Sequence, residues 1–132
     1  MSGPRARDSY VLSPELRAAR TCYDHLAGRL GIAITDALSQ DGSLTPEGAQ
    51  RLEALGLDIR SLRAGSRVFV RPCLDWTERR PHLAGALGAA IAARLFELGW
   101  VERSDATRAV RITDDGAEGL GAIVAGLGPV RA

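Results

Sequence analysis

The sequence contains no lysine: all 17 basic residues of the 132-residue chain are arginine, and 16 acidic residues balance them. The formal net charge of +1 excludes a strongly cationic nucleic-acid arm and an acidic tail. Arginine suits bidentate contacts with phosphate and carboxylate. The lack of lysine, together with abundant alanine and glycine, is also typical of a GC-rich bacterial genome. The arginine content alone therefore indicates no particular site.

Cysteine and long apolar runs are also scarce. Two cysteines, Cys22 and Cys73, are too few for a disulfide scaffold and fit a reducing compartment. Charged residues such as Arg29, Arg94 and Glu97 interrupt the longest apolar stretches, so no membrane span is predicted. The polar N-terminus has no apolar signal-peptide core. We therefore expect a cytoplasmic protein with no membrane partner.

Enzyme motifs are missing as well. The chain has no phosphate-binding glycine loop, no Gly-x-Ser-x-Gly element and no paired-histidine zinc helix. No set of nucleophile, base and orienting group can be assembled from its residues. We therefore expect a protein that is not an enzyme and has no catalytic residue.

Length and composition predict a single domain over residues 13–132 after a flexible lead-in at residues 1–12. Apolar residues recur at spacings of three and four from Leu16 to Ala37, which predicts one long helix behind the N-cap Ser13. The expected helices are 13–39, about 45–56, 77–98 and 113–127. The expected strands are 67–72, 100–103 and 108–113, with an irregular segment at 59–65 and a connector at 73–76.

A degenerate internal repeat divides this domain. The segment His25-Leu-Ala-Gly-Arg-Leu-Gly31 matches His82-Leu-Ala-Gly-Ala-Leu-Gly88 at an offset of 57 residues. Two copies at this period favour packing about a pseudo-twofold axis over a solenoid. The predicted fold is α+β and mainly helical. It has two winged-helix-like repeats, each a long helix, a hairpin or turn, and a helix, at about 13–57 and 67–128.

Four glycines occupy equivalent places in the two copies and fall in the predicted helices. Glycine inside a helix costs about 0.5–1 kcal/mol relative to alanine, and close approach of two helices is the natural compensation. The alternative is that glycine is simply common in this composition. We predict that the two long helices cross at the glycines, inside one chain or across a homodimer. These helix-packing residues are Gly28, Gly31, Gly85 and Gly88.

Three segments carry a family resemblance. Trp100-Val-Glu-Arg, with Arg108-Ala-Val-Arg-Ile-Thr-Asp-Asp-Gly-Ala-Glu-Gly-Leu120, resembles the wing and following helix of bacterial winged-helix transcription regulators. Arg20-Thr-Cys-Tyr-Asp-His-Leu-Ala-Gly28 and Cys73-Leu-Asp-Trp-Thr-Glu-Arg-Arg-Pro-His-Leu-Ala-Gly85 resemble the C-terminal half of ArsR-like regulators, the arsenical-repressor class. The resemblance covers nearly all of residues 14–127. It implies transcription regulation with double-stranded DNA as the partner.

The chain also departs from that family. In ArsR-like regulators a winged helix-turn-helix normally precedes this region, and reading DNA needs two short helices with the second in the major groove. Upstream of the helix predicted at 77–98 the sequence shows a strand and a connector instead. We therefore expect that the DNA-binding half is missing or that the chain is a shortened relative.

Clustered arginines are the candidate DNA contacts. Phosphate contacts release counterions and make binding strongly salt-dependent. The alternative is a solvated surface with local ion pairs. The candidates, in a basic run and on the predicted hairpin, are Arg67, Arg71, Arg79, Arg80, Arg103, Arg108 and Arg111.

The cysteines and histidines form a candidate metal set. Cys22 and His25 are three residues apart, and Cys73 and His82 are nine apart. Two thiolates and two imidazoles can make a tetrahedral site for zinc or another thiophilic metal, and no other cofactor is predicted. The spacing matches no recognised metal motif. Buried structural cysteines, a redox thiol pair and hydrogen-bonded core histidines therefore stay open as alternatives.

Three neighbours of this set have expected roles. Asp24 and Asp75 could orient an imidazole ring, and neither is expected to be catalytic. Trp76 is expected to be a core anchor for the following helix rather than the wall of a ligand pocket.

Two functions are compatible with these patterns. The first is a homodimeric transcriptional regulator with winged-helix character, or its effector and dimerisation half, binding DNA through an arginine-rich hairpin. The second is a module without DNA affinity that senses a small molecule or a metal.

Overall fold

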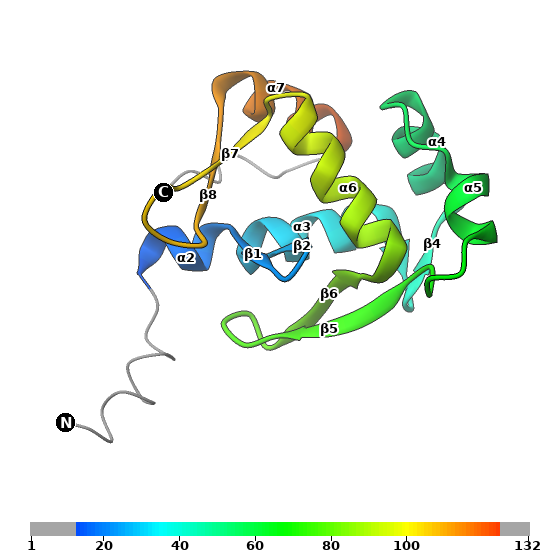
Figure 1. Cartoon of the computed structure of the whole chain (residues 1–132), viewed down its shortest axis with the longest axis horizontal. Coiled ribbons are helices and arrows are strands. Elements are labelled where there is room, and N and C mark those ends of the chain that lie inside the picture. Colours follow the sequence, from blue (N-terminus) through cyan, green and yellow to red (C-terminus); the bar gives the residue numbers. More distant parts are fainter. Residues whose placement is uncertain (1–12, 125–132) are drawn as a thin grey trace.

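A computed structural model describes residues 13–124, which form short helices and small antiparallel hairpins (Figure 1). The lead-in expected at 1–12 and the end of the helix expected to reach 127 lie outside the described residues. The helices are α2 (Pro14–Ala18), α3 (Gly28–Leu38), α4 (Pro46–Ala54), α5 (Ile59–Ala64), α6 (Gly85–Glu97) and α7 (Asp114–Ile123). The strands are β1 (Arg20–Cys22), β2 (His25–Ala27), β3 (Ser39–Gln40), β4 (Ser43–Leu44), β5 (Arg71–Asp75), β6 (Arg80–Ala84), β7 (Val101–Arg103) and β8 (Val110–Ile112).

The described strands pair into four two-stranded antiparallel sheets, each made of two consecutive strands. In the β1–β2 hairpin Cys22 lies opposite His25, and in the β5–β6 hairpin Cys73 lies opposite His82. An isolated bridge from Arg20 to Ala109 joins β1 to the residues before β8. No helix in residues 13–124 combines the length and the apolar character that crossing a bilayer requires.

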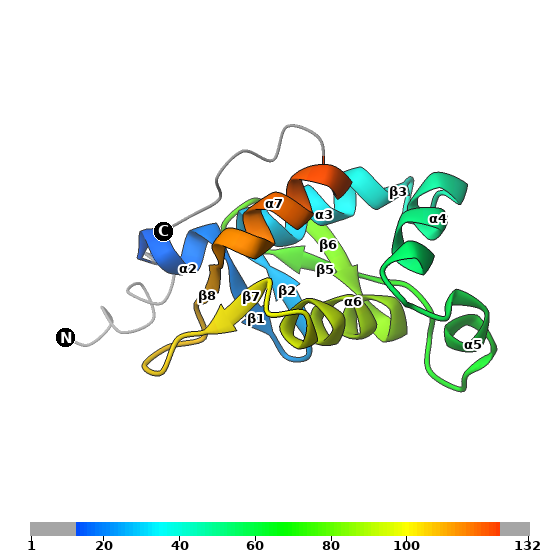
Figure 2. The same ribbon diagram turned by 90° about the horizontal axis from the view of Figure 1, so that it is seen from above.

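The same order of elements occurs twice along the chain. A hairpin, a helix, a short hairpin and a helix run from β1 to α4, and again from β5 to α7, with α5 in between. The hairpins β1–β2 and β5–β6 lie in the middle of the molecule, with α3 on one side and α6 on the other (Figure 2). The packing is reciprocal, because α3 contacts β6 and α6 contacts β2.

A threonine N-cap begins the last helix in each of these two series of elements, α4 and α7. The Thr45 Oγ1 accepts a hydrogen bond from the Gly48 N–H, and the Thr113 Oγ1 accepts one from the Gly116 N–H, both at 2.9 Å. Each cap satisfies a backbone donor that the first helical turn leaves free. The core is aliphatic, and its largest buried apolar side chains are Leu30, Leu38, Leu52, Leu87, Leu95, Leu120 and Val101.

The prediction of two long helices, at 13–39 and 77–98, is wrong. Each helix begins only at a glycine, Gly28 or Gly85, and both glycines have φ +78°, a left-handed conformation that interrupts a right-handed helix. Residues 14–18 form the separate short helix α2 behind the expected N-cap Ser13, and hairpin strands occupy residues 20–27 and 80–84. Tyr23, which belonged to the expected apolar seam, is 91% exposed in the first hairpin turn. Pro81 lies inside the second expected helix, where its missing N–H and its ring are incompatible with a helix interior.

Other local expectations also need correction. The segment 59–65 was expected to be irregular, but residues 59–64 form α5, and the Asp58 side chain accepts from the Ser61 N–H at its start. The strand expected at 67–72 and the connector at 73–76 are replaced by β5. Trp76 is 71% exposed, so it is not a core anchor. The tryptophan that packs on the core is Trp100.

The nearest atoms to each of the four glycines are backbone atoms of the segment that precedes its helix. A Cβ on Gly28 would meet the carbonyl oxygen of Arg17 at 2.8 Å, and one on Gly85 would meet that of Val68 at 2.8 Å. The nearest atoms to a Cβ on Gly31 or Gly88 belong to the strand before the helix, β2 or β6. Each glycine therefore allows close approach to the backbone that precedes its helix, and a crossing of the two helices at these glycines stays a prediction.

Candidate functional site

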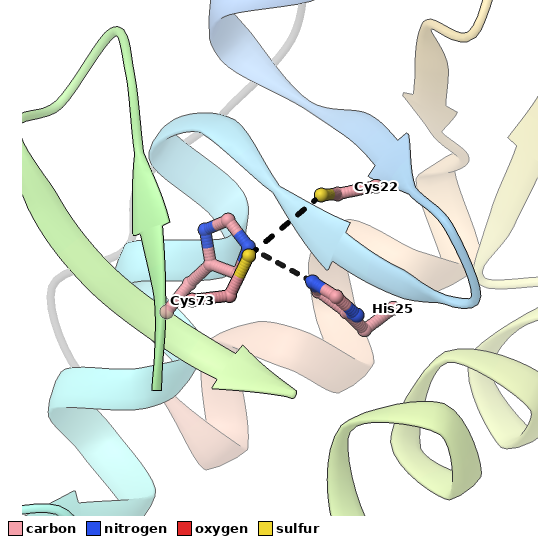
Figure 3. Close-up of side chains that lie close together, drawn as sticks. Cys22, His25 and Cys73 are labelled. Atoms are coloured by element: carbon pink, nitrogen blue, oxygen red, sulfur yellow. Dashed lines mark hydrogen bonds between the residues drawn. The ribbon is translucent and has the colours of Figure 1, made fainter. Parts of the chain in front are cut away.

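Two hairpins that are distant in sequence bring all the cysteines and histidines of the chain together. The chain has two cysteines and two histidines. Cys22, His25, Cys73 and His82, which we call the Cys–His cluster, place their potential ligand atoms within 4.8 Å of one another. Each hairpin supplies one directly opposed cysteine–histidine pair, and opposed residues of an antiparallel pair share one face. The two faces meet at the cluster (Figure 3).

The cluster has one close sulfur pair and one close nitrogen pair. The Sγ atoms of Cys22 and Cys73 are 3.9 Å apart, well beyond a disulfide bond of about 2.05 Å, and both thiols are free. The Nε2 atoms of His25 and His82 are 3.0 Å apart, and the two rings are tilted by 47°. Two sulfurs and two nitrogens thus converge on one small volume.

Burial sets the protonation of these groups. Both histidines are buried, whereas both cysteines are half-buried. Burial lowers the pKa of His25 and of His82 below the usual histidine value, so both rings are neutral at pH 7. Burial, together with the neighbouring Cys22, raises the pKa of the Cys73 thiol. A neutral imidazole offers one nitrogen lone pair, which is the form that binds a metal.

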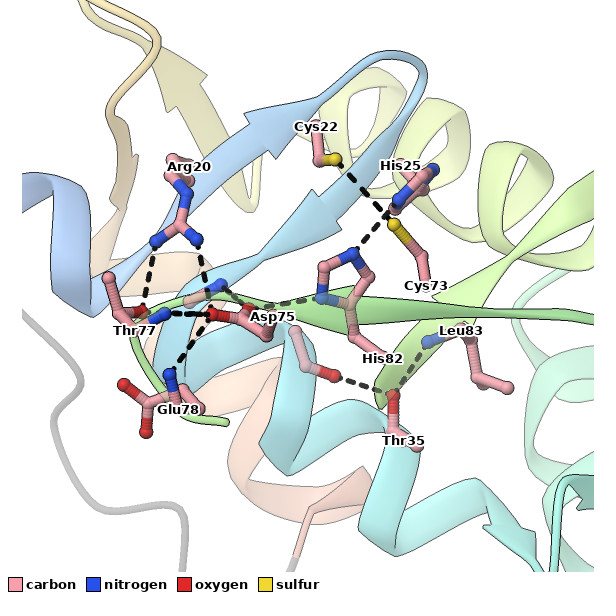
Figure 4. Close-up of polar contacts among 12 residues, drawn as sticks. Arg20, Cys22, His25, Thr35, Cys73, Asp75, Thr77, Glu78, His82 and Leu83 are labelled. Atoms are coloured by element: carbon pink, nitrogen blue, oxygen red, sulfur yellow. Dashed lines mark hydrogen bonds and ion pairs between the residues drawn. The ribbon is translucent and has the colours of Figure 1, made fainter. Parts of the chain in front are cut away.

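Asp75 contacts the ring nitrogen of His82 that is not paired with His25. The His82 Nδ1 lies 3.0 Å from the Asp75 Oδ2, and the same oxygen accepts a 2.7 Å hydrogen bond from the Gly28 N–H at the start of α3 (Figure 4). The Asp75 Oδ1 accepts from the Arg20 guanidinium at 3.1 Å and from the N–H and hydroxyl of Thr77. Burial alone raises the pKa of Asp75, but the Gly28 and Thr77 hydrogen bonds and the charge of Arg20 bring it well below the ordinary value. A buried carboxylate therefore links the cluster to the first hairpin and α3.

Asp24 faces the Nδ1 of His25 as Asp75 faces the Nδ1 of His82, but the distance between the two atoms is longer. The Asp24 Oδ1 is 3.5 Å from the His25 Nδ1, while the Asp24 Oδ2 pairs with Arg67 at 2.8 Å. A hydrogen bond from Arg67 is the main cause of a lowered pKa at Asp24. Among the described residues, the Asp24 Oδ1 and the His25 Nδ1 are the buried side-chain polar atoms without a hydrogen-bond partner.

Gly31 and Gly88 set the distance between each helix and the opposite histidine. A Cβ on Gly31 would lie 2.5 Å from the Leu26 carbonyl oxygen and 3.7 Å from the His82 Cβ. A Cβ on Gly88 would lie 2.5 Å from the Leu83 carbonyl oxygen and 3.2 Å from the His25 Cβ. Each glycine therefore lets one hairpin bring its histidine against the helix that follows the other.

Comparison with known proteins found one relative that bears on function. The chain is 44% identical over 111 residues to YdfF of Bacillus subtilis (strain 168), described as an uncharacterized HTH-type transcriptional regulator. The match covers 77% of this chain and 49% of that regulator. The chain therefore spans about half the length of the curated relative. No family model and no solved structure matched.

The candidate DNA-contacting arginines lie mainly on two hairpins. Five of them have contacts within the chain. Arg67 pairs with Asp24, Arg80 with Asp36 and Arg111 with Glu102, the Arg108 guanidinium donates to the Thr21 carbonyl, and Arg103 lies over the Phe96 ring. Arg71 and Arg79 are exposed on the β5–β6 hairpin. Contacts within the chain thus already engage five of the seven candidates.

Sequence reasoning missed Arg20, which is buried against Asp75. The signal that could have found part of this network is the segment Asp75-Trp-Thr77, since an aspartate two residues before a threonine favours a turn capped by its own carboxylate. The contact of Asp75 with Arg20 spans 55 residues and has no local signal.

Proposed function

We propose that this chain acts in transcription regulation and that residues 13–124 form an effector-responsive module. Similarity to an HTH-type regulator over about half of that protein supports the regulatory role. Binding to double-stranded DNA, homodimer formation, the ArsR-like class and winged-helix character belong to the proposal.

The observation that carries the proposal is the position of the Cys–His cluster between two hairpins. One pair of its residues comes from the β1–β2 hairpin and the other from the β5–β6 hairpin. Each hairpin leads directly into a helix, α3 or α6. A ligand held by the cluster contacts both hairpins at once, so its binding energy depends on how they are placed relative to each other. Differential binding to two arrangements is what a sensor requires.

The reciprocal packing supports a pseudo-twofold relation between the two runs of elements. The helix of each run lies against the hairpin of the other, and Gly31 and Gly88 occupy matching positions at the two contacts. A change at this junction would therefore reach both α3 and α6. The pseudo-twofold axis is part of the proposal.

The DNA contacts would come from the β7–β8 hairpin, which presents Arg103, Arg108 and Arg111. All three are exposed. Arg111 makes an ion pair with Glu102, which can be exchanged for a phosphate contact at low cost because surface ion pairs contribute little stability. The alternative, a sensing module without DNA affinity, is favoured by a specific observation: Arg111 already pairs with Glu102 on the same hairpin.

A salt titration of DNA binding distinguishes the two functions. The full chain is titrated onto a duplex carrying the region upstream of its own gene, and the affinity is measured by fluorescence anisotropy at several salt concentrations. Replacing the three hairpin arginines with alanine is expected to weaken binding and to reduce the salt slope by about 0.9 for each phosphate that is no longer neutralised. Arg29→Ala, an exposed arginine on α3, is the matched control and should bind like the wild type. Absence of salt-dependent binding supports the sensing module, and sedimentation of the same samples tests the homodimer.

A further inference from the structure

We propose that the Cys–His cluster binds one transition-metal ion of the zinc class in a tetrahedral site of two thiolates and two imidazoles. The inference deepens the proposed function and rests on it for the role of the metal as a signal. Metal binding itself is a property of the isolated chain and is tested without DNA.

The sulfur–sulfur and nitrogen–nitrogen distances fit this geometry, and all four ligand atoms lie within 4.8 Å of one another. In a tetrahedral zinc site with bonds of about 2.3 Å to sulfur and about 2.05 Å to nitrogen, the two sulfurs lie about 3.8 Å apart and the two nitrogens about 3.3 Å apart. The Sγ atoms of Cys22 and Cys73 are 3.9 Å apart, and the Nε2 atoms of His25 and His82 are 3.0 Å apart. Both pairs are therefore within a few tenths of an ångström of the separation that one ion requires.

The carboxylates behind the histidines orient both rings for coordination. A carboxylate can only accept, so the His82 Nδ1 that faces Asp75 carries the proton and the His82 Nε2 presents its lone pair to the cluster. Metal-bound histidines commonly donate their other ring N–H to a carboxylate in this way. Asp24 is placed to do the same for His25.

The hydrogen bonding of His25 gives the strongest argument for a cation. The His82 Nε2 is an acceptor, so a neutral His25 can contact it favourably only by donating from its own Nε2. The His25 Nδ1 is then a bare lone pair facing the Asp24 Oδ1, and these two atoms are the unpartnered pair described above. A cation between the two Nε2 atoms lets His25 carry its proton on Nδ1. The Asp24 Oδ1 then faces a donor instead of a lone pair, at the 3.5 Å separation of the ion pair.

The charge and softness of the donors select the metal. Two thiolates neutralise a divalent cation, and the adjacent Asp24 and Asp75 are already paired with Arg67 and Arg20. A neutral site is the form that burial tolerates. Sulfur and imidazole donors favour Zn²⁺ and other thiophilic ions, whereas Mg²⁺ and Ca²⁺ require oxygen donors.

Cobalt titration tests the proposal, because Co²⁺ replaces zinc and reports its own geometry. The full chain is purified under reducing conditions, stripped with a chelator and titrated with Co²⁺. The expected result is saturation at one equivalent, with the intense visible bands of tetrahedral cobalt and thiolate-to-cobalt charge-transfer bands in the near ultraviolet. Zn²⁺ should displace the cobalt, and Mg²⁺ should not.

Variants separate the site from adventitious binding. Cys73→Ser and His25→Gln should abolish the tetrahedral spectrum, with far-UV circular dichroism as a check of folding. Asp24→Asn should weaken metal affinity about 10–100-fold while the tetrahedral spectrum is kept, because it replaces the charged acceptor beside His25 with a weaker, neutral amide oxygen. Asp36→Asn is the matched control, since Asp36 also pairs with an arginine but lies outside the cluster.

Three results would overturn the proposal: no cobalt bound, a weak octahedral spectrum, or binding that Cys73→Ser leaves intact in a folded protein. Failure of the proposed function gives a different result. In that case the metal binds as described, but DNA affinity is absent or is the same with and without one equivalent of Zn²⁺.

Discussion

The Nδ1 of His82 lies 3.0 Å from the Oδ2 of Asp75, and both side chains are almost completely buried. The two residues are on opposite strands of the β5–β6 hairpin. The same carboxylate also accepts from the Gly28 N–H and from Arg20, which belong to the other half of the molecule. The orientation of His82 therefore depends on how the two halves are assembled.

Asp75→Ala is expected to destabilise the protein by about 3–5 kcal/mol, because it leaves the buried Arg20 without its counter-charge and the Gly28 N–H without an acceptor. Urea denaturation of the variant and the wild type measures the loss. Asp36→Ala, which removes an exposed ion pair with Arg80, should unfold close to the wild-type midpoint. Equal losses in both variants would show that Asp75 does not hold the two halves together.

Gly88→Ala is expected to destabilise strongly, because the added Cβ would lie 2.5 Å from the Leu83 carbonyl oxygen and press on His25. Gly121→Ala is the matched control in α7, where nothing lies within 4 Å of an added Cβ. The control should raise stability by up to about 1 kcal/mol, since alanine is the better helix former. Thermal unfolding of both variants checks the opposite signs. A tolerated Gly88→Ala would contradict the close contact between α6 and the hairpins.

Thr45→Ala and Thr113→Ala should have similar costs of about 0.5–2 kcal/mol each, because each removes the side-chain cap of an equivalent helix. Chemical denaturation provides the free energies. Thr45→Ser and Thr113→Ser keep the hydroxyl and should restore most of the lost stability. A large loss at one position and none at the other is the outcome that argues against equivalent roles for α4 and α7.

Tyr23→Asn is expected to raise stability by a few tenths to about 1 kcal/mol. Tyr23 has φ +59° in the first hairpin turn, and asparagine tolerates the left-handed region better than tyrosine. Its side chain is 91% exposed, so the exchange removes little packing. Asparagine in place of Ala93, an exposed position inside α6, should instead lower the melting temperature, because asparagine is the weaker helix former. A lower melting temperature for Tyr23→Asn would contradict the expected relief of backbone strain.

Local chemistry made part of the fold predictable from the sequence. The threonine caps at Thr45 and Thr113, and the hairpin near 101–112, follow from short motifs and lie where they were expected. The hairpins β1–β2 and β5–β6 were missed because single apolar residues at spacings of three and four, such as Ala19, Tyr23 and Leu26, also fit a helical period. Pro81 was the residue in the sequence that argued against the second long helix, because proline disrupts a helix interior.

The candidate site was predictable only as a set of residue types. Cys22, His25, Cys73 and His82 could be named, but their spacing matches no motif, because the site is formed by cross-strand pairs in two separate hairpins. Cross-strand register and the approach of the hairpins depend on interactions between residues far apart in sequence. The burial of Arg20 against Asp75 is one of these interactions.

The division of the buried Arg20–Asp75 pair between the two halves has a consequence for folding. A chain cut in the exposed segment between Gly65 and Ser66 leaves a buried cation in one fragment and its buried counter-anion in the other. Neither fragment alone can pair its buried charge, so each should stay largely unfolded. When the two fragments are mixed, the native circular dichroism spectrum should be recovered. The intact chain is accordingly expected to fold in one cooperative step, with the formation of long-range contacts limiting the rate.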